Sequence, residues 1–144
     1  MKYLSRSRNF RLGPRGKARD LKEVFHYVNT SYFGSGLPEP DFAWTNESAA
    51  RRLGFYSAPL NLLAVNSCLD SESVPRYVLE FIVYHELLHH KQAGTGSPIK
   101  RVHHTREFKE QEMRFTCYAE AERWLRKLVS MGRGRRHKQG VPRV

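Results

Sequence analysis

The chain has 144 residues, two cysteines and a formal net charge of +11. Its length fits one domain with an ordinary hydrophobic core, and no apolar run is long enough to cross a bilayer. Cys68 and Cys117 are too few and too far apart for a disulfide framework or a four-cysteine zinc ribbon. The N-terminal residues lack the apolar stretch of a secretory signal, so we expect a cytoplasmic protein without membrane contact.

The positive charge gathers at the two ends. Residues 1–19 hold seven Lys or Arg and residues 131–144 hold five, without an acid in either segment, while the other 13 bases face all 14 acids. Such ends attract DNA phosphates in a salt-dependent way, or they only keep the protein soluble. We therefore expect a basic, flexible N-terminal segment (residues 1–17), a folded domain (18–130) and a basic C-terminal tail (131–144).

The first half of the domain predicts one helix followed by a small sheet. Apolar residues recur at three- and four-residue spacing over residues 17–33, which indicates an amphipathic helix, and the glycines at 34 and 36 end it. Residues 41–45, 52–57 and 62–66 read as strands. The turn at residues 58–61 joins the last two strands as a hairpin.

The second half predicts two longer helices. Residues 74–92 are apolar on nearly all sides, which is typical of a buried helix, and Gly94, Gly96 and Pro98 then open a loop to about residue 103. A last helix is expected over residues 105–129. The resulting fold class is α+β, with a mostly antiparallel sheet of about three strands packed against about three helices.

The motif His85-Glu86-Leu87-Leu88-His89 lies inside the predicted buried helix. Two histidines four residues apart share one helix face, so both imidazoles can reach one Zn²⁺. A five-residue motif can match by chance. Polar groups on a buried helix need partners, however, and a metal ion would supply them. The sequence thus predicts a zinc cofactor held by His85 and His89, with Glu86 as the general base that takes a proton from a zinc-activated water.

A catalytic zinc also needs a third protein ligand and an open position for water. The favoured candidate is His104, at the start of the last predicted helix, and His103 is the second. A glutamate of that helix is the third option, as in gluzincins. The candidates of this kind are Glu107, Glu110 and Glu112.

Three successive segments resemble the SprT-like family of zinc metallopeptidases. They are the central motif, a glycine-bearing loop and His104-Thr105-Arg106-Glu107-Phe108. Residues 29–33, 37–38, 44, 52–56 and 61–66 are similar to the N-terminal helix and sheet of that family, so the resemblance covers about residues 18–128. It implies a zincin-like domain with His104 as third ligand. It also implies endopeptidase activity, which in Spartan members is directed at proteins crosslinked to DNA. Many relatives carry a C-terminal Cys₄ zinc ribbon that this chain lacks.

The expected activity is therefore hydrolysis of a protein or peptide substrate. Arg114 and Tyr118, four residues apart on the last predicted helix, are candidates for stabilising the oxyanion, or they are packing and surface residues. The substrate is expected to pair with a sheet edge in the hairpin of residues 53–65. The alternative is a non-catalytic, nucleic-acid-associated protein with a structural zinc site, whose metal would have a fourth protein ligand.

Overall fold

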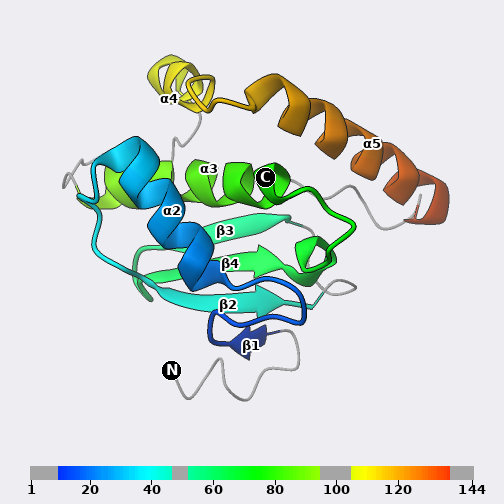
Figure 1. Ribbon diagram of the computed structural model, residues 1–144, viewed down its shortest axis with the longest axis horizontal. Coiled ribbons are helices and arrows are strands. Elements are labelled where there is room, and N and C mark those ends of the chain that lie inside the picture. The colour runs from blue at the N-terminus through cyan, green and yellow to red at the C-terminus, as the bar shows by residue number, and fades with distance from the viewer. Residues whose placement is uncertain (1–9, 47–51, 95–104, 137–144) are drawn as a thin grey trace.

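A computed structural model describes residues 10–46, 52–94 and 105–136 (Figure 1). The described chain forms an α+β fold, which confirms the predicted class. Its elements in order are β1 (Phe10–Leu12), α2 (Leu21–Phe33), β2 (Asp41–Thr45), β3 (Gly54–Ser57), β4 (Leu62–Asn66), the 3-10 turn η1 (Ser67–Leu69), α3 (Arg76–Gly94), α4 (Arg106–Glu112) and α5 (Tyr118–Arg136).

The sheet is mixed and has the strand order β1-β2-β4-β3 among the described residues. β1 runs antiparallel to β2 and β3 runs antiparallel to β4, but β2 and β4 are parallel, with Asp41 opposite Leu62. The prediction of three mostly antiparallel strands is corrected here. β1 was missed because three residues in a stretch rich in Arg and Gly are too short to show a period of two. This strand lies inside the segment 1–17 that was expected to be flexible.

The core lies between one face of the sheet and the helices (Figure 1). Alternate residues of β2 and β4 turn to this face, as the two-residue period of a strand requires: Phe42, Trp44, Leu63 and Val65. α3 lies in the middle, in contact with α2, β3, β4, α4 and α5. The prediction that this helix is buried in the core is confirmed, although it spans Arg76–Gly94 instead of residues 74–92.

The first helix begins at Leu21, four residues later than predicted. Asp20 is its N-cap, since the Asp20 side chain accepts a hydrogen bond from the Lys22 N–H at 2.9 Å. The helix ends where expected, because Gly34 adopts a left-handed conformation with φ of 58°.

The single last helix predicted over residues 105–129 is two helices, α4 and α5. Between them Phe115 is only 3% exposed, and its ring lies 5.3 Å from that of Phe81 and 5.5 Å from that of Tyr84. The chain therefore changes direction around a buried aromatic side chain. α5 then continues to Arg136, inside the expected tail of residues 131–144. Within the described ranges, no helix is both long enough and apolar enough to cross a bilayer.

Candidate metal centre

The predicted motif lies on α3 with both histidines on one face. The centroids of the His85 and His89 rings are 5.1 Å apart. His85 is only 3% exposed and His89 is partly exposed, so the pair leads from the core towards the surface. This arrangement follows from the four-residue spacing on a helix, as the sequence predicted.

Phe108, at the start of α4, packs over both histidines. Its ring centroid lies 5.1 Å from that of His85 and 4.6 Å from that of His89. The first turn of α4 is fixed there by Thr105, whose hydroxyl accepts the Phe108 N–H at 3.1 Å. The residue that precedes this N-cap is His104. α4 therefore begins against the two helical imidazoles.

The predicted third ligand is not placed. His104 and the alternative His103 both lie outside the described residues. In the part of the chain that the structure describes, no group of three His, Cys, Asp or Glu side chains is arranged to hold a metal ion. The choice between these two histidines as third ligand stays a prediction.

Of the glutamates considered as ligands, only Glu112 is buried, and it contacts the site. It is 6% exposed, and one of its carboxylate oxygens is hydrogen-bonded to Nδ1 of His85. The other oxygen accepts from Nζ of Lys109 at 3.1 Å. Burial raises the pKa of Glu112, but the hydrogen bonds and positive charges of His85 and Lys109 outweigh burial and hold that pKa below its ordinary value. Glu107 and Glu110 are exposed on the same helix.

This contact selects the nitrogen that can face a metal. An ionised carboxylate only accepts, so Nδ1 of His85 carries a proton, and Nε2 is the nitrogen that carries the lone pair when the ring is neutral. Nε2 lies on the side of Glu86, 3.9 Å from its carboxylate. Nε2 is therefore the His85 nitrogen that could bind a metal ion, on the side of Glu86.

Glu86 is a buried carboxylate at the junction of α3 and β3. It is 3% exposed, and burial raises its pKa to about 7 against the opposing charges of His85 and Arg52. The Tyr56 N–H of β3 hydrogen-bonds to the Glu86 carboxylate. A carboxylate with this pKa can both take and return a proton near neutral pH.

β3 lies tightly against α3 at this point. A Cβ built on Gly54 would lie 3.0 Å from Cγ2 of Ile82 and 3.4 Å from Cγ of Glu86. The strand can approach the motif this closely only because residue 54 is glycine.

The two oxyanion candidates do not lie on one helix. Arg114 is exposed in the turn after α4, whereas Tyr118 is the first residue of α5. The Tyr118 ring lies 5.3 Å from Nζ of Lys109 and 5.7 Å from the ring of Phe81. Their supposed four-residue helical spacing is thus corrected by the break at Phe115, and their role towards an oxyanion stays a prediction.

His90, next to His89, faces another direction. Its Nε2 lies 2.9 Å from the carbonyl oxygen of Pro38, and its ring lies 4.7 Å from that of Tyr56. These contacts tie α3 to the segment before β2 and to β3, so His90 has a packing role.

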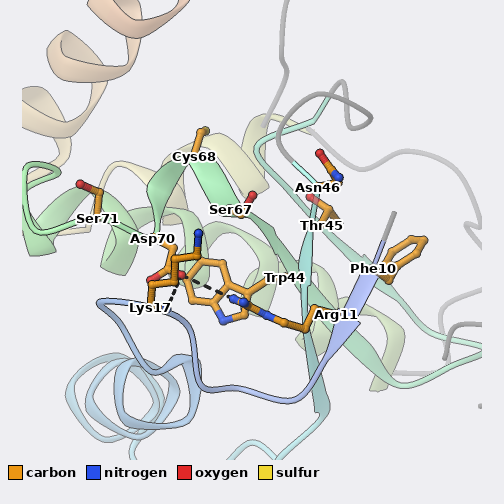
Figure 2. Close-up of a pocket in the computed structure, with 10 residues that line it drawn as sticks. All are labelled: Phe10, Arg11, Lys17, Trp44, Thr45, Asn46, Ser67, Cys68, Asp70 and Ser71. Carbon is orange, nitrogen blue, oxygen red and sulfur yellow. Dashed lines mark hydrogen bonds and ion pairs between the residues drawn. The ribbon is translucent and has the colours of Figure 1, made fainter. Parts of the chain in front are cut away.

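A separate groove of about 470 Å³ lies at the carboxyl ends of β2 and β4 (Figure 2). None of the predicted site residues lines it. At its base Asp70 accepts hydrogen bonds from the N–H groups of residues 17–19 at 2.6 to 2.9 Å, and Arg11 lies 3.5 Å away. A Cβ on Gly16 would overlap this carboxylate. At this groove the N-terminal segment is thus hydrogen-bonded to Asp70, the residue that follows η1.

Comparison of the chain with protein-family models, curated proteins and solved structures finds no match. The zincin-like and SprT-like resemblance of the sequence therefore stays a prediction. Support for a function comes from the geometry around α3.

Proposed function

We propose that this protein is a zinc-dependent endopeptidase of the SprT-like type. The observation that carries the proposal is the pairing of His85 with Glu112, which directs the lone pair of the imidazole towards the side of Glu86. An oriented histidine ligand beside a buried carboxylate is the arrangement that a hydrolytic metal site needs.

His85, His89 and His104 are the residues that would hold the metal. When bound, Zn²⁺ supplies a Lewis acid that acidifies a water molecule and polarises a scissile carbonyl. Glu112 orients His85, and Phe108 packs against both helical imidazoles.

Glu86 is the proton carrier in this proposal. Its carboxylate takes a proton from the attacking water and returns it to the leaving amine. The raised pKa supports both steps, because a base with a pKa near 7 is neither fully protonated nor too weak at neutral pH. Arg114 and Tyr118 remain candidates for assisting the oxyanion.

The proposed substrate is an extended protein segment that pairs with β3. β3 is the terminal strand of the described sheet, and its Tyr56 N–H points to Glu86. Backbone pairing at such an edge is tolerant of sequence, so unfolded or extended chains are the expected class. The net charge of +11 supports a location near DNA, where DNA-bound proteins would be cut.

The test compares wild-type protein with Glu86→Gln on an unfolded protein substrate, with the zinc content of both measured. Glu86→Gln should keep one zinc per chain and lose activity by about 10²-fold or more, because only proton transfer is removed. Glu122→Gln, which also removes one carboxylate but from a partly exposed position on α5, should change neither quantity.

Two outcomes would contradict the proposal. Equal activity of wild type and Glu86→Gln would remove Glu86 from the mechanism. Four protein ligands around the zinc, seen by X-ray absorption, would instead support the structural zinc site of a non-catalytic protein. His104→Ala identifies the third ligand, since loss of the zinc is expected if His104 binds it.

A further inference from the structure

A chain of three side chains runs from the surface of α4 to the buried helix α3. Nζ of Lys109 donates to Oε1 of Glu112 at 3.1 Å, and Oε2 of Glu112 is hydrogen-bonded to Nδ1 of His85. The Lys109 side chain is 53% exposed, whereas those of Glu112 and His85 are 8% and 4% exposed. This series of side chains therefore has Lys109 in solvent at one end and His85 in the core at the other.

Each carboxylate oxygen of Glu112 contacts one partner, Nζ of Lys109 or Nδ1 of His85. A buried carboxylate without partners would take up a proton, but here each oxygen has a donor. An ionised Glu112 fixes the His85 ring in one orientation and one tautomer. It also makes the opposite nitrogen more basic, which strengthens a bond to a metal cation.

We propose that Glu112 and Lys109 are positioning residues that set the affinity of His85 for zinc. This inference rests on the proposed function, since it names residues that act on the same site. Glu112 acts directly on Nδ1. Lys109 acts only through Glu112, by keeping the carboxylate oriented. Neither residue is proposed to touch the metal or the substrate.

The test measures two properties that do not depend on catalysis. The first is the zinc dissociation constant, obtained by competition with a chromogenic chelator. The second is the His85 tautomer in metal-free protein, read from long-range ¹H–¹⁵N correlation spectra. Glu112→Gln keeps an acceptor for Nδ1 but removes the charge, and it should weaken zinc binding by about 10- to 100-fold. Glu112→Ala should also lose the single Nδ1–H tautomer.

Lys109→Met provides the second, exposed variant, and it should weaken zinc binding by a smaller factor than Glu112→Gln. The matched control is Glu122→Gln, which removes a carboxylate of α5 that lies 3.7 Å from Arg126. This control should bind zinc like the wild type.

The outcomes separate this inference from the proposed function. If wild type binds zinc and is active but Glu112→Gln binds it as tightly with the same tautomer, the pair only ties α4 to α3 and the inference is overturned. It is also overturned if X-ray absorption shows Glu112 as a zinc ligand. A wild type that binds no zinc would overturn both proposals.

Discussion

The pKa values of two carboxylates of this protein, Glu86 and Asp70, are shifted in opposite directions. Glu86 lies in the core with one backbone donor, and burial raises its pKa to about 7. For Asp70, burial also acts to raise the pKa, but hydrogen bonds from the backbone N–H groups of residues 17–19 and the charge of Arg11 outweigh it and leave the pKa lowered. The sign of each pKa shift follows from the balance between burial, which raises the pKa, and hydrogen-bond donors and positive charges, which lower it.

Asp70→Asn should destabilise the protein by about 2 kcal/mol at pH 7, because three N–H groups lose a charged acceptor. A carboxylate whose folded-state pKa is lowered stabilises the fold above its unfolded-state pKa, and this contribution is lost as the pH falls through the folded-state value. Urea unfolding should therefore show a difference between Asp70→Asn and wild type that shrinks in acid. Asp41→Asn, at an exposed position of β2, is the control, and an equal loss there would contradict the assignment.

The sequence could predict some of these residues and not others. His85, Glu86 and His89 share one short motif, so their spacing on a helix revealed them. Glu112 was one of three glutamates considered as ligands. Its contact with Nδ1 of His85 could not be foreseen, because the two residues are 27 positions apart and meet through the packing of α4 on α3. Asp70 was missed for the same reason, since its partners lie more than 50 positions earlier.

Among the elements, those with a clear period were predicted closely. β2 and β4 have the predicted bounds, since alternating or continuous apolar residues stand between turn residues. The parallel pairing of these two strands was not predicted, because β4 is also the second strand of a hairpin with β3 and takes the position between β3 and β2. The break between α4 and α5 was hidden because Phe115 continues the apolar spacing of a helix.

The contact of β3 with α3 gives a prediction at this scale. Gly54→Ala should destabilise the protein by about 1–3 kcal/mol, because the new Cβ would lie 3.0 Å from Cγ2 of Ile82 and 3.3 Å from the Ala64 carbonyl oxygen, so that the Ile82 side chain or the strand must shift by a few tenths of an ångström. The same movement displaces Glu86, so the rate of substrate hydrolysis should fall more than stability alone explains. Thermal unfolding and kcat measured at a temperature where both proteins are folded provide the comparison.

The control is Ser57→Ala on the same strand, at a partly exposed position away from the helix contact. It should leave kcat unchanged. A Gly54→Ala protein with wild-type kcat and stability would mean that β3 yields easily at this point, and that the close approach does not position Glu86.

For the whole molecule, the structure changes where the excess charge lies. Residues 1–9 and 137–144 together carry five of the eleven net positive charges, so the other six belong to residues 10–136. Some of these bases already have structural partners, as Arg19 donates to the carbonyl oxygen of Val74 at 2.9 Å and Arg11 lies beside Asp70. Part of the basic N-terminal segment therefore belongs to the described fold.

Deletions of terminal residues test which part of the molecule contributes to stability and which to DNA binding. Removing residues 1–17 should lower the urea midpoint, because β1 and the Lys17 N–H bonded to Asp70 are lost. Removing residues 1–9 and 137–144 together should reduce the slope of log affinity for duplex DNA against log salt by up to about 4. An unchanged slope would place the DNA contacts on the folded part alone.

The two edges of the sheet differ in length and neighbours. β1 has three residues and carries Arg11, and both features discourage another strand from joining. In β3, by contrast, the Tyr56 N–H is directed at Glu86. An edge that accepts any extended chain also accepts the same edge of a second molecule. If β3 holds the substrate as proposed, pairing of two molecules through β3 would compete with the substrate, and the specific activity should then fall as the protein concentration rises.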